Sequence, residues 1–305
     1  MKIAIIGSGA MGMLFGGYLS RDNAVVLIDA DKARVDEMNK NGICIQEPGG
    51  SLLRAHARAA CSAAGLGEMD LVMLWVKAMD SRDALEAWRG LAGSKTFLMS
   101  LQNGSGHDAV LREFAAEEQI IVGTTQHNSS VVEPGVIFHG GAGKTFIGPI
   151  TGDGNRLKPV EQTMNRCGFE TEISDNIRRK IWEKLFLNAS ASALTAILQT
   201  RLGFLLESKP AALLTERLVR EAVAVANAEG MGFEEESIQR DIRTLLENAR
   251  GGYTSIYADI RDGRKTEVDA ISGSVVAAGK RNKVPVPSHE FVVELIHALE
   301  DKGIS

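Results

Sequence analysis

The chain has 305 residues, of which 44% are hydrophobic and 24% charged, and its formal net charge is −5. This length suffices for two domains, and the composition is that of a globular protein. The acidic balance and the lack of a basic tract exclude the electrostatic pattern of a nucleic-acid binder. No apolar run reaches the roughly 18–20 residues that span a bilayer, and the chain opens on a strand-like run without signal-peptide features. We therefore expect a cytoplasmic protein.

The cysteine and histidine positions predict no metal site. Cys44, Cys61 and Cys167 are far apart and match no zinc-binding spacing, and the histidines form no HxH or HExxH pattern. Reduced, buried thiols are the simplest interpretation in a cytoplasmic protein.

The first predicted element is a buried strand over 2–6, which a glycine-rich turn, GSGAMG, follows directly. A helix-like run over 11–19 comes next, and then a second strand over 24–28 that ends at Asp29. This order of elements is the fingerprint of a dinucleotide-binding domain, in which glycines permit the turn, the approach of the pyrophosphate and close helix packing. The alternative is a purely structural glycine-rich turn that binds no ligand. The predicted cofactor contacts here are Gly7, Ser8, Gly9, Ala10, Met11 and Gly12.

Asp29 predicts which dinucleotide binds. A carboxylate at the end of the second strand accepts hydrogen bonds from the ribose hydroxyls and repels a 2′-phosphate, so it favours NAD(H) over NADP(H). Lys32 and Arg34 follow closely and are the residues that could reach a phosphate instead.

Polar side chains follow the later strands of the same predicted sheet. Buried strands are predicted over 71–76, 96–101 and 120–124. Lys77, Asn103 and His127 each come just after one of them, where ligands bind in doubly wound sheets. Loop capping is the alternative role, but for Lys77 and Asn103 we prefer a functional one. Two further short strands are expected over 43–46 and 53–59, and a β-hairpin over 135–148.

From about residue 174 the pattern becomes helical. Helices are predicted around 180–197 and over 208–230, 234–248, 254–261, 266–281 and 288–302. The predicted fold class is therefore α/β, with a Rossmann-type doubly wound sheet over residues 1–173 and an all-helical domain over 174–305.

The helix around 180–197 is apolar except for a narrow polar stripe. Lys184, Asn188 and Ser192 are spaced i, i+4, i+8, which places them on one helical face. Such a stripe indicates a buried helix with one face on a polar cleft, where a lysine donates a proton or anchors an anion. The alternative is a core helix whose lysine snorkels to water.

A second candidate constellation lies at 253–273. Ser255 and Asp259 are i, i+4 on one predicted helix, and Glu267 follows Thr266, the expected N-cap of the next. Taken alone, Glu267 is best interpreted as a first-turn carboxylate that complements the helix dipole.

Together these motifs resemble the ketopantoate reductase (2-dehydropantoate 2-reductase) family over essentially the full chain. The resemblance rests on GSGAMG at 7–12, VKA at 76–78, LQNG at 101–104, VGTT at 122–125, and the segments 182–196 and 255–273. It implies an oxidoreductase of pantothenate biosynthesis with its site in the cleft between a Rossmann domain and a helical domain. The implied reaction is reduction of the ketone of a 2-oxo acid, 2-dehydropantoate to pantoate, by a nicotinamide cofactor. A homodimer through the helical domain is a family-level expectation.

The resemblance also implies roles for individual residues. Lys184 matches the general acid that protonates the ketone oxygen, Glu267 a glutamate between substrate and cofactor, and Ser255 a serine that binds the substrate carboxylate. The implied catalytic residues are Lys184, Glu267 and Asn188. The implied substrate contacts are Asn103, Asn188, Ser192 and Ser255. The implied contacts at the nicotinamide end are Lys77, Asn103 and Glu267.

Two departures from the family pattern bear on specificity. Ser192 stands where well-studied members have a second asparagine, which leaves the 2-oxo acid open. Ala30 stands where NADP-using members tend to place an arginine, which again favours NAD(H).

Other functions remain as alternatives. One is an NAD-dependent D-2-hydroxyacid dehydrogenase of the mandelate type within the same family. Another is a 3-hydroxyisobutyrate-type dehydrogenase, against which the segment TEVDAISG argues. From a different class, the chain could be a dinucleotide-sensing protein without catalysis, which the retained Lys184, Asn188, Ser255 and Glu267 disfavour.

Overall fold

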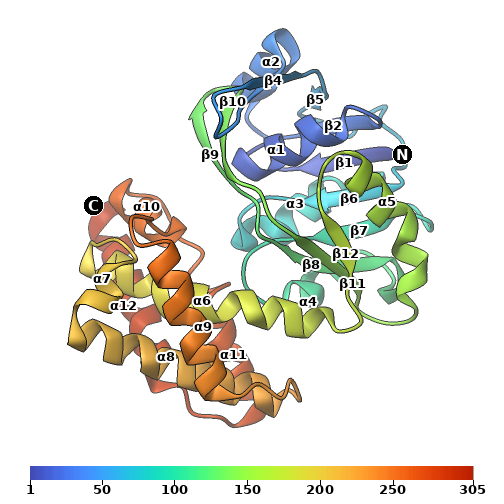
Figure 1. Ribbon diagram of the computed structural model, residues 1–305. Coiled ribbons are helices and arrows are strands. Elements are labelled where there is room, and N and C mark those ends of the chain that lie inside the picture. The colour runs from blue at the N-terminus through green and yellow to red at the C-terminus, as the bar shows by residue number, and fades with distance from the viewer. Residues whose placement is uncertain (305) are drawn as a thin grey trace. The chain divides into compact units, whose positions relative to one another are not determined.

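The computed structural model describes residues 1–304, and these form two compact units (Figure 1). The first comprises Met1–Gln102 and His107–Lys180, and the second comprises Asn103–Gly106 and the chain from Ile181 onward. The short segment Asn103–Gly106 is therefore packed with the helical unit although both of its neighbours in sequence belong to the first. The division near the start of the helical part falls at Lys180, inside a helix.

An eight-stranded sheet forms the frame of the first unit. Its order is β12-β11-β8-β7-β6-β1-β2-β5, and all neighbours are parallel except β11 and β8. Its strands are β1 (Lys2–Ile6), β2 (Ala24–Ile28), β5 (Arg58–Ala60), β6 (Leu71–Leu74), β7 (Phe97–Ser100), β8 (Ile120–Thr125), β11 (Thr145–Pro149) and β12 (Thr171–Ile173). The chain runs from β1 to one side and then returns to β6 on the other, so the strand order reverses beside β1. In open α/β sheets, ligands bind at such a switch point. The predicted doubly wound sheet is confirmed.

A second, four-stranded sheet corrects two sequence predictions. Its order is β4-β3-β10-β9, with β3 (Ile43–Gln46), β4 (Leu52–Ala55), β9 (Asn128–Glu133) and β10 (Val136–Gly141). The strand expected over 53–59 is in fact two strands, β4 and β5, in different sheets. The hairpin expected over 135–148 is also wrong, because β10 pairs with β9 and β3 whereas β11 pairs with β8 and β12.

Helix α1 (Ala10–Leu19) joins the two sheets, since it contacts β1 and β2 of the large sheet and β3, β4, β9 and β10 of the small one. It is therefore buried over most of its length, and Phe15 stacks on Phe169 at 4.1 Å between ring centroids. The other helices of this unit are α2 (Lys32–Asn41), α3 (Ser81–Ala87), α4 (His107–Leu111) and α5 (Lys158–Arg166), with short 3₁₀ turns η1 (Ala78–Asp80), η2 (Arg89–Leu91), η3 (Glu117–Gln119) and η4 (Gly154–Leu157).

The second unit is helical and has its own apolar core. Helix α6 (Ile177–Leu198) begins in the first unit, where Asn176 Oδ1 accepts the Arg179 N–H of its first turn at 3.1 Å. The remaining helices are α7 (Phe204–Glu207), α8 (Lys209–Ala228), α9 (Glu235–Asn248), α10 (Ser255–Arg261), α11 (Ser272–Asn282) and α12 (Pro287–Ile304). The central side chains of the core include Trp182, Phe186 and Val219. Within residues 1–304, no helix is long and apolar enough to cross a membrane.

Candidate active site

The glycine turn after β1 has the shape that a dinucleotide requires. Gly7 has φ +96°, and a Cβ there would lie 2.8 Å from the backbone carbon of Trp75, which follows β6. A Cβ on Gly12 would lie 1.9 Å from the carbonyl oxygen of Gly7, so helix α1 packs directly on the turn. At Gly9, which caps α1, a Cβ would meet nothing within 4 Å. The turn is therefore tightly packed against helix α1 and the segment after β6, but space is open at Gly9, at the N-terminus of α1. This arrangement fits a pyrophosphate.

Asp29 is tied to this turn. Its Oδ2 accepts hydrogen bonds from the backbone N–H of Ser8 at 2.9 Å and the Ser8 hydroxyl at 2.6 Å, and lies 3.1 Å from Nη1 of Arg34. Oδ1 accepts the N–H of Asp31 at 2.9 Å. Burial alone would raise the pKa of Asp29, but these hydrogen bonds and the Arg34 charge outweigh it and lower that pKa. Asp29 is thus an anion. The neighbouring Lys32 forms an ion pair with Asp36, with 2.6 Å between Nζ and Oδ2.

The segment after β6 is fixed by a residue that the sequence analysis missed. The Gln102 amide donates to the carbonyl oxygen of Val76 at 2.7 Å and to the Ser81 hydroxyl at 3.0 Å. Gln102 is 7% exposed, so these contacts are shielded from water. They hold the turn in which Lys77 caps the 3₁₀ turn η1. The position of Gln102 directly before the predicted Asn103 was the only sequence feature that could have indicated this role. The partners of Gln102 could not be predicted, because they lie more than 20 residues away in sequence.

Lys184 makes its contact within the helical unit. Its Nζ donates to Oδ1 of Asn103 at 2.9 Å, although the two residues are 81 positions apart. Burial lowers the pKa of Lys184 to about 8, and the nearby charge of Glu267 acts in the opposite direction. The lysine is therefore poised to exchange a proton near neutral pH. Three of the predicted residues, Lys184, Asn103 and Glu267, are thus brought together.

Glu267 lies on a loop and not on a helix. Helix α11 begins at Ser272, so the helix predicted from Thr266 starts six residues too early. Thr266 does not cap that helix; its hydroxyl accepts the N–H of Val268 at 3.1 Å in a local turn. This loop packs on the segment after β7, because a Cβ on Gly104 (φ +100°) would lie 1.8 Å from the carbonyl oxygen of Ala270.

Ser255 is placed by a threonine pair. Thr254 caps helix α10 by accepting the N–H of Tyr257, and its hydroxyl lies 2.8 Å from that of Thr195 on α6. The Thr195 hydroxyl also donates to the carbonyl oxygen of Ser192 at 3.0 Å. The pair therefore connects the Ser192 turn of α6 to the start of α10, where Ser255 is exposed. Along the predicted stripe, Lys184 and Asn188 are partly buried and Ser192 is 3% exposed.

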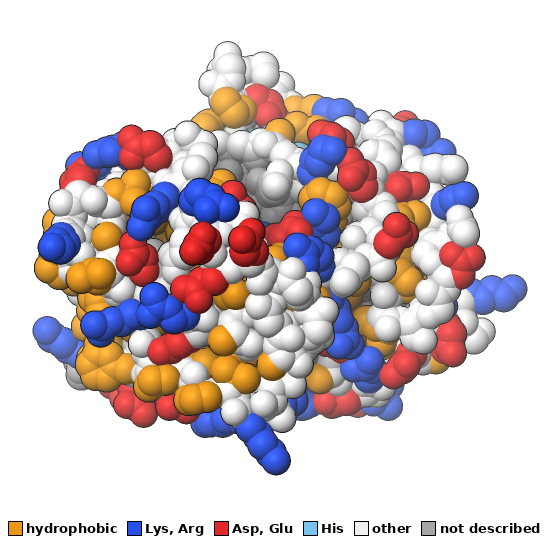
Figure 2. Space-filling view, turned by 60° about the horizontal axis from the view of Figure 1, so that its bottom comes forward, with side chains coloured by type: hydrophobic (Ala, Val, Ile, Leu, Met, Phe, Trp, Pro, Cys, Tyr) orange, Lys and Arg blue, Asp and Glu red, His pale blue; other side chains and the backbone are white. Residues whose placement is uncertain are grey.

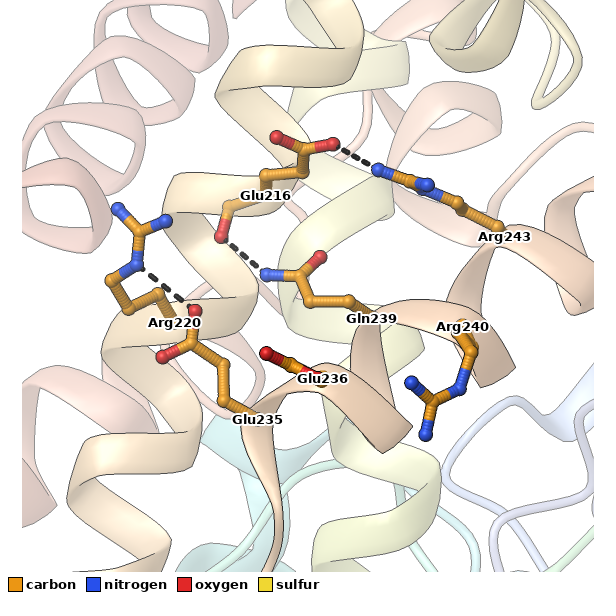
Figure 3. A pocket seen from close by; sticks show the side chains of 7 residues that line it. All are labelled: Glu216, Arg220, Glu235, Glu236, Gln239, Arg240 and Arg243. Atoms are coloured by element: carbon orange, nitrogen blue, oxygen red, sulfur yellow. Dashed lines mark hydrogen bonds and ion pairs between the residues drawn. The ribbon is translucent and has the colours of Figure 1, made fainter.

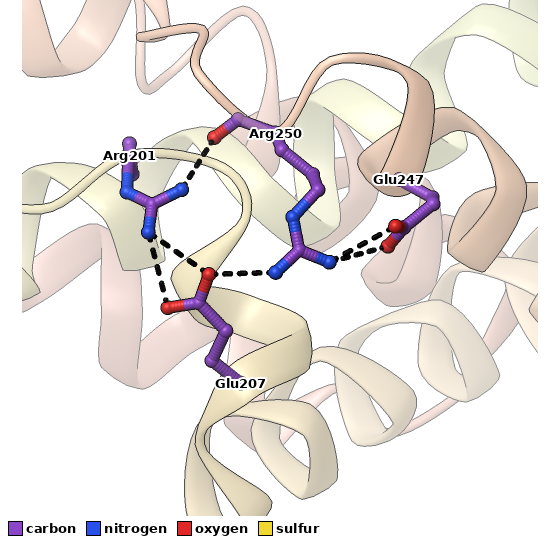
Figure 4. Close-up of polar contacts among 4 residues, drawn as sticks. All are labelled: Arg201, Glu207, Glu247 and Arg250. Carbon is purple, nitrogen blue, oxygen red and sulfur yellow. Dashed lines mark hydrogen bonds and ion pairs between the residues drawn. The ribbon is translucent and has the colours of Figure 1, made fainter.

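A cluster of ion pairs lies beside the chain that leads into this threonine pair (Figure 4). Glu207 lies 2.9 Å from Arg201 and 2.8 Å from Arg250, and Arg250 also contacts Glu247 at 2.8 Å. All four side chains are substantially exposed, so each pair contributes little by itself. Together they connect the end of α7 to the end of α9 and to the loop before α10.

A pocket of about 310 Å³ on helices α8 and α9 is a different feature (Figure 3). It is lined by Glu216, Arg220, Glu235, Glu236, Gln239, Arg240 and Arg243. Arg220 pairs with Glu235 at 3.0 Å, and Arg243 pairs with Glu216. None of the predicted site residues lines it, and its opposite charges are equal in number.

The surface of the molecule carries charged side chains of both signs. Figure 2 shows Lys and Arg side chains interspersed with Asp and Glu across one face. Within the described part of the chain, no group of three or more His, Cys, Asp or Glu side chains could hold a metal ion.

Family models and known proteins match this chain over most of its length. The family model described as Ketopantoate reductase PanE/ApbA matches residues 3–152, and the model of its C-terminal part matches residues 176–300. The 2-dehydropantoate 2-reductase of Halobacterium salinarum is 30% identical and is aligned over 99% of this chain and 100% of its own length. That of Pyrococcus horikoshii is 31% identical, over 99% of both chains. A ternary structure of D-mandelate dehydrogenase with NADH and anilino(oxo)acetate superposes with a TM-score of 0.93 at 28% identity, covering 99% of both chains.

Proposed function

The chain belongs to the ketopantoate reductase family, and from this premise we propose that it reduces 2-dehydropantoate to pantoate with a nicotinamide cofactor. The family is one of oxidoreductases that act on a 2-oxo acid. What we propose is therefore which 2-oxo acid and which coenzyme this chain uses, and which of its residues carry out the reaction. The observation that carries it is the Lys184–Asn103 pair, at 2.9 Å, in which the pKa of the lysine is lowered to about 8.

Most of the proposed cofactor contacts are residues of the first unit. They are Gly7, Ser8, Gly9, Ala10, Met11, Gly12, Asp29 and Lys77, and the two other proposed contacts are Asn103 and Glu267. When bound there, a reduced nicotinamide dinucleotide supplies a hydride for the ketone carbon. The open space at Gly9 and the N-terminus of α1 support a pyrophosphate at this turn.

The proposed coenzyme is NAD(H) in preference to NADP(H). Asp29 is anionic and paired with Arg34 at 3.1 Å. A 2′-phosphate at this point would have to draw Arg34 away from Asp29 and would then face a carboxylate whose negative charge is no longer paired with a cation, and that charge repels the phosphate. Ribose hydroxyls, by contrast, donate to a carboxylate. Ala30 offers no competing cation.

The proposed chemical step uses the second unit's polar groups. As the ketone carbon is reduced, negative charge develops on its oxygen, and the Lys184 ammonium stabilises that charge and gives up its proton to form the hydroxyl. Asn103 holds the lysine through its Oδ1, and the charge of Glu267 favours the protonated lysine. Asn188 positions the substrate, Glu267 lies between substrate and cofactor, and Ser255 binds the substrate carboxylate.

A second candidate within the same family is reduction of an aromatic 2-oxo acid of the benzoylformate type. The likeness to D-mandelate dehydrogenase at a TM-score of 0.93 favours it, as do Ser192 and the Asp29–Ala30 pair. A serine at position 192 is shorter than an asparagine and provides no amide donor, so it removes one polar contact from the proposed substrate site.

The test is a steady-state assay of several 2-oxo acids, ketopantoate and benzoylformate included, each with NADH and with NADPH. We expect the highest kcat/KM with ketopantoate and NADH. A higher kcat/KM for benzoylformate would favour the second candidate, and a markedly higher kcat/KM with NADPH would contradict the coenzyme proposal. Dinucleotide binding without turnover of any acid would instead support a non-catalytic sensor.

A further inference from the structure

The loop that carries Glu267 lies between helices α10 and α11, and it has little regular structure of its own. Its backbone is closed by hydrogen bonds from the N–H groups of Ala270 and Ile271 to the carbonyl oxygen of Glu267, at 3.1 Å each. A carboxylate on such a loop needs support from elsewhere in the fold if its position is to be precise.

Helix α12 contacts the loop on the N-terminal side of Glu267. Oε1 of Glu300 accepts the backbone N–H of Thr266 at 2.8 Å, and Oε2 lies 3.3 Å from Nζ of Lys265. The Glu300 side chain is 2% exposed, whereas Lys265 is half exposed. A buried carboxylate thus takes its shortest hydrogen bond from the residue directly before Glu267.

The same helix contacts the loop on the C-terminal side of Glu267. Nδ1 of His297 lies 3.2 Å from Oε2 of Glu300, and its Nε2 lies 3.1 Å from Oδ1 of Asp269. An imidazole donates from both nitrogens only when it is protonated. His297 therefore connects Glu300 to Asp269. Helix α12 thus contacts the loop at Thr266, one residue before Glu267, and at Asp269, two residues after it.

The charges agree with this arrangement. Burial alone would raise the pKa of Glu300, but hydrogen bonds from Thr266, His297 and Lys265 outweigh burial and lower it. Burial alone would lower the pKa of His297, but the Glu300 and Asp269 carboxylates outweigh it and raise it. Asp301 lies 3.9 Å from Lys265 at the edge of the group. The cationic partners of Glu300 are about half exposed, and such ion pairs add little net stability, so a role in fixing position accounts better for the buried Glu300 carboxylate.

We propose that Glu300 and His297 are positioning residues that hold Thr266 and Asp269 and thereby set the place of the Glu267 carboxylate. The inference rests on the proposed role of Glu267 in the reaction. It assigns to helix α12 a part in catalysis that is exerted entirely through the Glu267 loop.

The first test is a double-mutant cycle on kcat/KM. Glu300→Gln is expected to lower kcat/KM about 10-fold, because a misplacement of about 1 Å at a reacting group can cost roughly 100-fold. In a Glu267→Gln background, the same substitution should cost little further, because the group that it positions has already been changed. Equal losses in both backgrounds would overturn the inference.

The cycle also separates this inference from the proposed function. If Glu267→Gln itself leaves kcat/KM unchanged, the proposed role of Glu267 fails, and the inference fails with it. If Glu267→Gln is impaired and Glu300→Gln is not, the inference alone fails.

The matched control is Glu221→Gln. Glu221 also accepts backbone N–H groups of helix α12, from Ser288 at 3.0 Å and His289 at 3.1 Å, but at the opposite end of that helix. This variant should lose stability while its kcat/KM stays unchanged. A drop in kcat/KM equal to that of Glu300→Gln would show that any loosening of α12 impairs the enzyme, and would overturn the specific role of Glu300.

A second variant keeps the test valid if Glu300→Gln does not fold. The His297 side chain is 42% exposed, so His297→Ala should be tolerated. The pKa of His297, measured by NMR titration of its imidazole, should lie above 6.5 in the wild type. The protonated imidazole that connects Glu300 to Asp269 is therefore fully formed only well below that raised pKa, and it is lost as the pH rises through this pKa. The wild-type pH profile of kcat/KM should show this step and the His297→Ala profile should lack it; identical profiles would overturn the inference.

Discussion

At the scale of single residues, Lys184 is the centre of the proposed chemistry. We predict that Lys184→Met lowers kcat for 2-oxo acid reduction by about 100- to 10,000-fold, the usual range for loss of a general acid. The dissociation constant for NADH, measured by fluorescence titration, should stay near the wild-type value because the proposed dinucleotide contacts are elsewhere. Lys180→Met, one turn earlier on α6, is the control and should keep kcat. Normal turnover by Lys184→Met would end the assignment.

The pKa of Lys184 predicts the direction of the pH dependence. Reduction needs the ammonium form, so kcat should fall as the pH rises above about 8, the value to which burial lowers this pKa. The charge of Glu267 raises the pKa of Lys184, so Glu267→Gln should move the inflection to lower pH. A profile that is flat from pH 7 to 10, or an inflection that moves upward, would contradict this prediction.

The same pKa bears on stability. Folding lowers the pKa of Lys184 from its ordinary 10.5 to about 8, so the folded protein binds fewer protons than the unfolded chain between these values. The free energy of unfolding should therefore rise with pH across that window. Below pH 8 the buried charge costs stability, and Lys184→Met should leave the thermal midpoint at pH 7 unchanged or raised. Lower activity with undiminished stability is the signature of a functional residue.

At the scale of elements, Gly104 determines how the Asn103 segment meets the Glu267 loop. A methyl group at Gly104 would lie 1.8 Å from the carbonyl oxygen of Ala270, and its φ is +100°. We predict that Gly104→Ala lowers both stability, by about 1–3 kcal/mol, and kcat. Gly106→Ala is the control, since its φ is +85° but its Cβ would meet nothing within 4 Å. It should lose stability alone, as chemical denaturation and steady-state kinetics would show. Equal effects of the two variants on kcat would contradict the argument.

In helix α6, the sequence predicted which residues share a face but not which distant residues they contact. The i, i+4, i+8 spacing identified the face of Lys184, Asn188 and Ser192 because helical periodicity is local. Thr195 was not identified, since a threonine in an apolar helix usually bonds its own backbone. It does so here, but its hydroxyl also meets Thr254 at 2.8 Å, which no spacing within α6 could predict.

At the scale of the whole molecule, the two units have separate cores and separate proposed tasks. We predict that hydrogen exchange will separate them. NADH should slow exchange in the first unit around 7–13 and 29–31, and an unreactive 2-oxo acid analogue added to the NADH complex should slow it in the second, around 184–195 and 254–256. Mass spectrometry of peptic peptides measures both. Protection by NADH confined to the helical unit would contradict the assigned tasks.

The sequence by itself determined the features that depend on neighbours along the chain. The glycine turn between β1 and α1, the apolar strands of the large sheet and the polar face of α6 were all predicted, and the family resemblance is confirmed. Each of these features follows from a local sequence pattern, either a repeat of polar and apolar residues every two or 3.6 positions or a short motif.

Only the tertiary structure decided which distant residues meet. The Lys184–Asn103 contact joins positions 81 apart and the Glu300–Thr266 contact positions 34 apart. The assignment of β10 and β11 to different sheets, and the loop in place of a helix at Glu267, likewise depend on packing partners elsewhere in the chain. Such contacts follow from the balance of burial and hydrogen bonding over the whole fold, which local spacing does not record.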